Sequence, residues 1–458
     1  MKKRLAIVSS YNEECGAAFY SSRLLKHLIA DGYEVEVKRL PVALLRTISP
    51  YIVRHKADLE IKRIASEIRE YDAVLFQFEP GLYGAIPKLS YPRVLKLIKA
   101  AKNAILTVHG FDRQMTDRYV SNVFNAVVRG RPMIALAELL EGGIDPYISS
   151  FWEYVYRSPH IKVMTFNRAD QILLQRFFDL NRITHYPITY YAQDEVEQIR
   201  EEVDREQFLR RFGLDPSRKY FAVFGFLSWY KGHLTAMKAL EFLPEDWHLA
   251  IIGGEHPQAL EGDRDIGAYV RQILAFSLGQ QKANGIDSDM VLLPGDHKGK
   301  SNGQMMAHAG NLDRLEIKEH LFKYSEFKYF LPSKELHDRI HYLGQVSDED
   351  MPKFYAAMDY AVHPYVKTKS GQSGSGPATF ALEFKTRSLF SNAPVFREMN
   401  LYFKDAMHFF NVGNFIELAE SLQRFDRFHE NLQTNLNTAL QTYNPRGMVD
   451  AYRQLLEA

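Results

Sequence analysis

The chain has 458 residues, of which 46% are hydrophobic, 25% charged and 13% aromatic, and its formal net charge is +1. This composition is that of a globular protein, and the length predicts two or three domains. A charge so close to zero argues against nucleic acid as a partner. The single cysteine, Cys15, excludes an intramolecular disulfide and favours a reducing, cytoplasmic compartment. The apolar runs are too short for a signal peptide or a membrane span.

Short apolar runs alternate with helical segments through the first 190 residues. The runs typical of strands cover residues 4–10, 32–40, 71–78, 103–110, 161–167 and 183–190. After the first run, Ala17, Tyr20, Leu24, Leu25 and Leu28 recur at helical spacing. Strands that alternate with helices indicate βαβ units and a parallel sheet. Residues 111–160, mostly helical in pattern, exceed what a minimal unit of this kind needs.

A charged stretch at 194–219 predicts a solvated linker with one surface helix, after which a second series begins. Its predicted strands cover residues 220–227, 247–254, 339–346, 358–365, 393–396 and 408–412. We therefore predict an α/β protein with two doubly wound domains, residues 1–195 and 196–445. We expect a long insertion at about 256–338 and a C-terminal helix, 446–458, that returns to the first domain.

The residues that could take part in binding or catalysis follow predicted strands, and ligands bind at these strand ends in open α/β sheets. They are Gly16, His109, Gly225, Lys231 and the Gly/Ser loop at 370–376. Lys231 could hold a phosphate as a point charge, or it could be a solvated lysine at a helix start. His109 could contact a substrate hydroxyl as a neutral imidazole, or it could be a structural histidine.

The Gly/Ser loop precedes a helix-like stretch, "GPATFALEF". Glycines let backbone N–H groups approach a ligand, and Pro377 suits the first position of a helix. The free N–H groups of a helix start favour a phosphate. Glu383 follows Pro377 by roughly 9 Å of helix and could accept hydrogen bonds from a ribose. The alternative interpretation is a flexible surface loop followed by an ordinary glutamate.

Two further segments carry predictions about partners. His297, His308 and His320 follow no zinc spacing, and we expect no bound metal. The segment from Lys38 to Arg63 mixes basic and apolar residues. This mixture predicts contact with an anionic membrane surface, and the alternative is a helix packed on its own sheet with a solvated basic face.

These features together resemble the retaining glycosyltransferases of family 4, which have the two-domain GT-B architecture. The resemblance covers nearly the whole chain, and its motifs lie mainly in the second half. The motifs are "FGFLSWYKGHLTAMKALEFLP", "WHLAIIGGEHP", "RIHYLGQVSDEDMPKFYAAMDYAVHPY", "ALEFKTRSLFSNAPVF" and "HFFNVGNFIELAESL". In the family they form the strands and helices of the donor domain in this order.

The resemblance implies transfer of a sugar, with retention, from a nucleotide diphosphate sugar to a glycan or lipid-linked acceptor in cell-surface polysaccharide assembly. The reaction would take place in a cleft between the domains, without metal or other cofactor. The protein would be cytoplasmic or peripheral on the inner membrane face. The residues that the resemblance implies for catalysis are His109 near the reacting sugar, Lys231 on the donor diphosphate and Glu383 on the ribose. Donor binding would also use Gly16, Gly225, Gly374, Ser375 and Gly376.

The sequence departs from the family pattern at two positions. Family members often carry a glutamate eight positions before the one at Glu383, where this chain has Ser375, and an arginine where it has Phe226. Two other functions therefore stay open: a GT-B nucleotide-sugar epimerase, and a catalytically inactive partner subunit that binds nucleotide or glycan.

Overall fold

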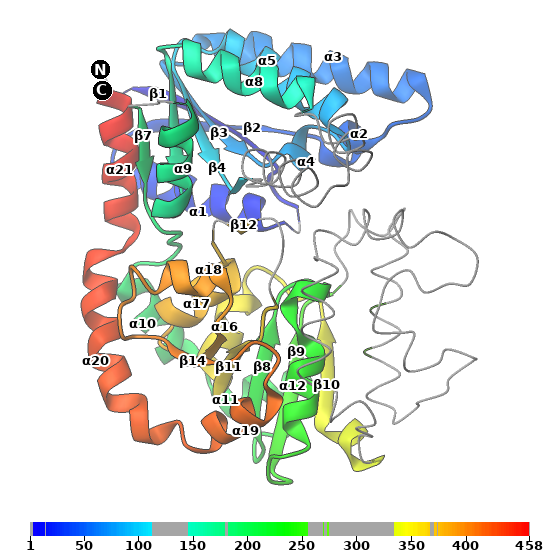
Figure 1. Cartoon of the computed structure of the whole chain (residues 1–458), viewed down its shortest axis with the longest axis vertical. Coiled ribbons are helices and arrows are strands. Elements are labelled where there is room, and N and C mark those ends of the chain that lie inside the picture. The colour runs from blue at the N-terminus through cyan, green and yellow to red at the C-terminus, as the bar shows by residue number, and fades with distance from the viewer. Residues whose placement is uncertain are drawn as a thin grey trace, which may run out of the picture. The chain divides into compact units, whose positions relative to one another are not determined.

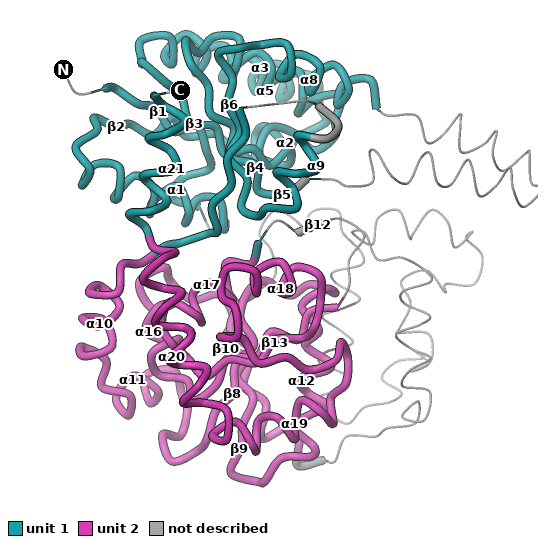
Figure 2. The backbone as a smooth tube through the Cα atoms, turned by 60° about the vertical axis from the view of Figure 1, so that its left-hand side comes forward, with its two compact units in different colours: residues 1–190, 370–374, 445–458 teal, residues 191–369, 375–444 magenta. Residues whose placement is uncertain are grey.

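The computed structural model of the chain describes residues 3–13, 15–111, 145–178, 182–254, 269, 273, 334–366, 371–372 and 374–457. The chain forms two compact units (Figure 2). Unit 1 comprises Met1–Tyr190, Ser370–Gly374 and Pro445–Ala458, and unit 2 comprises Tyr191–Lys369 and Ser375–Asn444. Most of the predicted insertion, including the three histidines at 297, 308 and 320, lies outside the described residues.

Unit 1 is built on a six-stranded parallel sheet with the order β2-β1-β3-β4-β6-β7. Its strands are β1 (Arg4–Ser9), β2 (Glu34–Arg39), β3 (Ala73–Phe78), β4 (Ala104–Val108), β6 (Ile161–Thr165) and β7 (Ile183–His185). The strands β3 and β4 are buried along their whole length, which explains why they read as continuous apolar runs.

The helices of unit 1 are α1 (Gly16–Ala30), α2 (Val42–Arg46), α3 (Tyr51–Glu67), η1 (Ile68–Glu70), α4 (Pro80–Tyr83), α5 (Pro87–Ala100), α8 (Pro146–Arg157), α9 (Arg168–Phe178) and α21 (Pro445–Glu457). Helices α3, α5 and α8 cover one face of the sheet, and α1 and α21 lie on the other (Figure 1). The C-terminal helix is tied to the sheet where the Tyr452 hydroxyl meets Thr107 Oγ1 at 2.6 Å.

Unit 2 has a second six-stranded parallel sheet with the order β10-β9-β8-β11-β13-β14. Its strands are β8 (Lys219–Phe224), β9 (Trp247–Ile252), β10 (Ile340–Gly344), β11 (Tyr360–His363), β13 (Arg387–Ser391) and β14 (His408–Phe410). Its helices are α10 (Gln193–Glu202), α11 (Arg205–Arg211), η3 (Trp229–Lys231), α12 (His233–Leu240), η5 (Lys334–Arg339), α16 (Asp350–Ala357), α17 (Gly376–Glu383), α18 (Pro394–Met399), α19 (Phe415–Gln423) and α20 (Asp426–Thr442).

The prediction of two doubly wound α/β units is confirmed, and two local predictions are wrong. Residues 393–396 do not form a strand, because Pro394 starts helix α18 and lacks the N–H that an inner strand donates. The fifth strand is β13 instead, whose first residues, Arg387 and Ser388, hid it from the apolar pattern. The charged stretch at 194–219 holds two helices, and Asp204 caps the second by accepting from Gln207 N at 3.1 Å.

A short antiparallel pair in unit 1 joins β5 (Gly110–Phe111) to β12 (Gly371–Gln372). Gly371 lies opposite Phe111, and Gln372 lies opposite Gly110. Part of the backbone of the Gly/Ser loop is therefore fixed by strand pairing beside the end of β4. Within the described part of the chain, no helix is long and apolar enough to cross a membrane.

Gly232 offers a test of the backbone that carries η3. It adopts φ +68°, and a Cβ atom there would lie 1.9 Å from Pro364 O. We expect Gly232→Ala to lower the free energy of unfolding of unit 2 by about 3 kcal/mol, because left-handed strain adds to a backbone clash. Denaturation followed by the fluorescence of Trp229 and Trp247 measures this.

The matched control is Gly213→Ala, since Gly213 has φ +72° and a Cβ atom there would meet nothing within 4 Å. It carries the strain without the clash, so we expect a loss of about 1 kcal/mol. Equal losses in the two variants would contradict the close approach of Gly232 to Pro364.

Candidate functional site

The strand order of unit 2 changes direction between β8 and β11. Ligands in doubly wound sheets bind at the carboxyl ends of the strands that flank such a point. Gly225 follows β8 with φ +102°, and a Cβ atom there would lie 3.1 Å from Lys231 Nζ and 3.3 Å from Pro377 Cγ. The structure therefore brings Gly225, Lys231 and the start of α17 together at this point, as the sequence predicted.

Lys231 is a buried cation without a carboxylate partner among the described residues. The residue is only 4% exposed, and its ammonium donates to the hydroxyl of Tyr365. The ammonium also lies 4.3 Å from the centre of the Tyr365 ring. Burial lowers the pKa of Lys231 to about 7. Such a group gains most from a ligand that brings a negative charge.

Two buried histidines lie near Lys231. One follows it by two residues in the sequence, and the other lies at the end of a strand of the sheet. His233 opens α12 and His363 ends β11, and both residues are 0% exposed. Burial, and then the charge of Lys231, lower the pKa of each imidazole to about 3. His233 Nδ1 lies 3.0 Å from the Tyr269 hydroxyl, whereas neither ring nitrogen of His363 hydrogen-bonds to a described residue. Both imidazoles are thus neutral in the pH range in which Lys231 gains or loses its charge.

The residues of the predicted phosphate loop divide between the two units. Ser375 caps α17, with its Oγ accepting from Ala378 N at 3.4 Å and lying 2.9 Å from the Tyr365 hydroxyl. Gly376 is the first residue of that helix. Gly374 belongs to unit 1, where a Cβ atom would lie 2.7 Å from Ile188 Cδ1. Ser375 and Gly376 therefore lie with Lys231 in unit 2, and Gly374 packs in unit 1.

Glu383 lies at the other end of α17 and is 2% exposed. Its Oε2 accepts from the backbone N–H of Tyr191 at 3.3 Å. Because α17 has eight residues, Glu383 lies roughly 10 Å along the axis from its start. This separation matches the sequence expectation, but a ribose hydroxyl would share the carboxylate with Tyr191, a partner that the sequence did not indicate.

In unit 1, Gly16 and His109 follow strands at the carboxyl edge of the sheet. Gly16 starts α1, whose N-terminus has no side-chain cap, and a Cβ atom at Gly16 would meet nothing within 4 Å. The half-buried His109 has its Nε2 at 2.7 Å from Gln77 Oε1. Burial lowers the pKa of His109 to about 4. With Nε2–H donating to the amide oxygen, Nδ1 stays available as an acceptor.

Sequence reasoning missed Gln77, which orients His109. Gln77 lies in β3 and is 0% exposed, and its Oε1 fixes the tautomer of the imidazole. The sequence held a signal for it, because Gln77 is the one polar residue of the strand "AVLFQF". Tyr365 was missed as well, although it ends a predicted strand at the edge where Lys231 lies.

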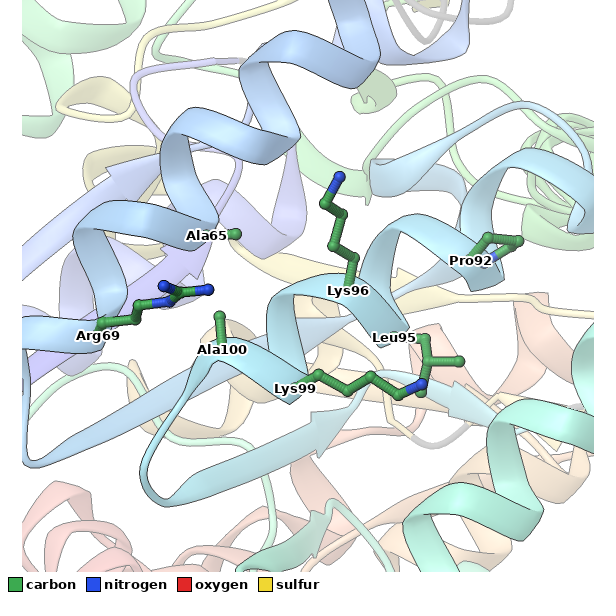
Figure 3. Close-up of a pocket in the computed structure, with 7 residues that line it drawn as sticks. All are labelled: Ala65, Arg69, Pro92, Leu95, Lys96, Lys99 and Ala100. Atoms are coloured by element: carbon green, nitrogen blue, oxygen red, sulfur yellow. The ribbon is translucent and has the colours of Figure 1, made fainter.

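A pocket with a cavity volume of about 420 Å³ lies elsewhere in unit 1, between α3, η1 and α5 (Figure 3). It touches none of the predicted site residues. Its lining consists of Ala65, Arg69, Pro92, Leu95, Lys96, Lys99 and Ala100. None of these lining residues is a carboxylate, so we name it the basic pocket. Within the described residues, no group of three or more His, Cys, Asp or Glu side chains could hold a metal ion.

No protein-family model matches this sequence, and no curated protein matches it. Solved structures match over the whole chain. The Anabaena protein HepE in complex with UDP has a TM-score of 0.54 at 12% identity, covering 100% of this chain and 99% of that one. Sucrose-phosphate synthase from Thermosynechococcus elongatus has a TM-score of 0.56 at 15% identity, covering 100% of both chains. A UDP-forming trehalose-phosphate synthase from Burkholderia xenovorans has a TM-score of 0.59 at 12% identity, covering 99% of this chain and 100% of that one.

The chain has the GT-B fold. At these identities the likeness establishes the architecture of two Rossmann-like units, and the roles of individual residues are argued from the site itself.

The pKa of Lys231 makes the stability of unit 2 depend on pH. An unfolded lysine titrates near 10.4, so between about pH 7 and pH 10 the unfolded chain holds a proton that the folded chain has lost. Stability should therefore rise with pH in this window, by up to about 1.4 kcal/mol per pH unit. We expect Lys231→Met to remove this component from denaturation curves recorded across the window. A wild-type slope that survives the substitution unchanged would contradict it.

Proposed function

We propose that this protein transfers a sugar, with retention, from a nucleotide diphosphate sugar to a glycan or lipid-linked acceptor. The observation that carries the proposal is Lys231, a buried cation without a described carboxylate partner. It lies where the strand order changes direction between β8 and β11 and where α17 begins. A leaving nucleoside diphosphate is the anion that such a position suits. The GT-B fold supports the proposal, since HepE was solved with UDP and with UDP-glucose.

The chemistry asked of unit 2 is stabilisation of the charge that develops on the leaving diphosphate. Lys231 supplies a charge in a water-poor setting, and the N-terminus of α17 supplies backbone N–H groups. These groups need little reorganisation, because Lys231 already donates to the Tyr365 hydroxyl and Ser375 already caps α17. Under this proposal the reaction requires neither metal nor other cofactor.

The proposed role of unit 1 is acceptor binding. His109 is neutral, and its orientation by Gln77 leaves Nδ1 able to accept from a sugar hydroxyl. The uncapped start of α1 at Gly16 adds N–H groups at the same edge of the sheet. We place transfer in cell-surface polysaccharide assembly, in line with the structural neighbour WaaG, a glycosyltransferase involved in lipopolysaccharide biosynthesis.

Because Ser375 and Phe226 depart from the family pattern that the sequence resembles, two other functions must also be tested. An epimerase would release nucleotide from a nucleotide sugar in water with no acceptor present. An inactive partner subunit would bind nucleotide without consuming any nucleotide sugar. The presence of Lys231, Glu383 and His109 in this sequence favours the transferase.

Nucleotide binding is the first test. We expect one of UDP, GDP, ADP or dTDP to raise the melting temperature of the wild type, since a ligand at about 100 times its Kd adds about 2.7 kcal/mol to stability. Calorimetry with that nucleotide should show Lys231→Met binding about 10- to 100-fold more weakly, because a charge-assisted contact of roughly 1.5–3 kcal/mol is lost. Glu383→Ala should weaken binding as well.

Lys238→Met is the matched control, since Lys238 is a partly buried lysine of α12 away from the start of α17. It should bind the nucleotide like the wild type. If none of the four nucleotides binds, or if Lys231→Met binds as tightly as Lys238→Met, the donor site is misplaced.

We also propose that α3 contacts an anionic membrane surface. Helix α3 packs on the unit 1 core through Ala57, Ile61, Ile64 and Ala65, yet Tyr51 is 69% exposed and Ile52 is 62% exposed. The cations at the two ends of the predicted basic segment are already paired with carboxylates, since Lys38 pairs with Glu36 and Arg63 with Glu67. Cations without a carboxylate partner among the described residues lie instead in the basic pocket at the end of the helix, which suits phosphate headgroups.

Vesicle binding tests this contact. We expect the wild type to sediment with vesicles that contain phosphatidylserine and not with phosphatidylcholine alone. Removing the three cations by Arg69→Gln, Lys96→Gln and Lys99→Gln should weaken binding about 100-fold, at about 1 kcal/mol for each charge. Ile52→Ser should weaken it too.

The controls are Lys88→Gln, an exposed lysine of α5 outside the basic pocket, and Leu401→Ser, an apolar residue of unit 2 that is 64% exposed. Neither should change sedimentation. Equal binding to both kinds of vesicle would rule out the contact.

A further inference from the structure

The hydrogen-bond partner of Lys231 is a phenol, where a buried ammonium ordinarily has a carboxylate. Among the described residues, its one hydrogen bond is to the Tyr365 hydroxyl, and its ammonium also lies over the ring of that tyrosine. The Tyr365 hydroxyl continues to Ser375 Oγ at 2.9 Å, and Ser375 Oγ accepts from Ala378 N in the first turn of α17. A chain of hydrogen bonds therefore links Lys231 to the start of the helix.

The directions of the first and last links of this chain are fixed by their donors. A charged ammonium has only donors, so Lys231 donates and the Tyr365 oxygen accepts. Ser375 Oγ accepts the N–H of Ala378, and between the hydroxyls of Tyr365 and Ser375 either oxygen can be the donor. A carboxylate at this position would only accept.

The backbone and ring of Tyr365 are held from three sides. Its carbonyl accepts from Ser391 Oγ of β13 at 2.6 Å. Its ring lies edge-on to Tyr230, with centroids 5.4 Å apart, and 4.7 Å from the ring of Phe396. The next residue, Val366, donates its N–H to Tyr230 O at 2.8 Å, which couples the strand end to η3. The Tyr365 hydroxyl is thus a fixed point for a flexible lysine side chain.

We propose that Tyr365 is a positioning residue of this site: its hydroxyl fixes the Lys231 ammonium and connects it, through Ser375, to the N-terminus of α17. Ser375 alone stands at the position where the family that the sequence resembles often has a carboxylate. Tyr365 stabilises the charged form of Lys231 without neutralising it, which leaves the charge for an anionic ligand. The inference rests on the proposed function only in taking that ligand to be a nucleoside diphosphate.

The titration of Lys231 in the free protein tests the inference without any ligand. The groups that face the ammonium are His233 of α12, His363 of β11, and the rings of Tyr230 and Tyr365. The pKa of each histidine is about 3, so both stay neutral in the window where Lys231 titrates, which is centred near pH 7. The protonation of Lys231 can therefore be followed with little interference from its neighbours.

We expect Tyr365→Phe to lower the midpoint of the Lys231 titration by about one to two pH units, because the charged form loses one hydrogen bond. The measurement is NMR of protein labelled with ¹³C at the lysine ε-carbon, with the Lys231 signal assigned by its absence in Lys231→Met. Tyr360→Phe is the matched control, a buried tyrosine at the other end of β11, and it should leave the midpoint in place. An unchanged midpoint in Tyr365→Phe overturns the inference.

A second variant keeps the test decisive should Tyr365→Phe not fold. Ser375→Asp preserves a good helix cap and places a carboxylate at the end of the chain of hydrogen bonds. It should raise the Lys231 midpoint by about one to three pH units. A midpoint that does not move in Ser375→Asp would show that Ser375 and Lys231 are not connected as the structure indicates, and would overturn the inference.

The affinity for UDP separates this inference from the proposed function. In the wild type, UDP affinity should fall as pH rises above the Lys231 midpoint, and in Tyr365→Phe the fall should begin about one to two pH units lower. A purely structural role for Tyr365 would weaken binding equally at every pH. If UDP binds neither protein but another nucleotide of the panel does, that nucleotide takes its place. If none binds, the proposed function fails while the Lys231 titration still decides the role of Tyr365.

Discussion

The burial of one positive charge is the constraint on which the centre of unit 2 depends. Removing an ammonium from water costs several kcal/mol unless a partner compensates. Lys231 has a phenol hydroxyl and an aromatic face, and no carboxylate among the described residues. The protein accepts part of this cost in the free state, as the lowered pKa of Lys231 shows. Buried groups whose pKa is shifted in this way are typical of functional sites.

Glycines make the position of this charge possible. A Cβ atom at Gly225 would make a tight contact of 3.1 Å with Lys231 Nζ, and a Cβ atom at Gly253 would lie 2.3 Å from Gly225 O. A Cβ atom at Gly232 would meet the carbonyl of Pro364 in the same way. The three glycines follow strand ends or precede a helix, so the backbone packs closely around the lysine. The sequence therefore has glycines at the positions where close packing of the backbone around Lys231 requires them.

Much of the fold could be predicted from the sequence, because buried parallel strands read as uninterrupted apolar runs. The exception was β13, which begins with Arg387 and Ser388, so a proline-led helix beside it looked like the strand. Lys231 and Ser375 were found for the same reason, since each follows a strand that the pattern revealed. Tyr365 and Gln77 were missed as partners, because hydrogen bonds between residues distant in the sequence leave no periodic signal.

The serine at 375 makes physical sense once Tyr365 is considered with it. A carboxylate so near a buried ammonium would pair with it, raise its pKa and compete with an incoming anion for the same charge. A hydroxyl adds no charge, and besides accepting from Ala378 N it carries a hydrogen that it can donate. Lys231, Ser375 and the start of α17 then all present donors. A serine at this position thus supplies a group that can donate where a carboxylate could only accept, which favours a ligand oxygen without a hydrogen, such as one on phosphate.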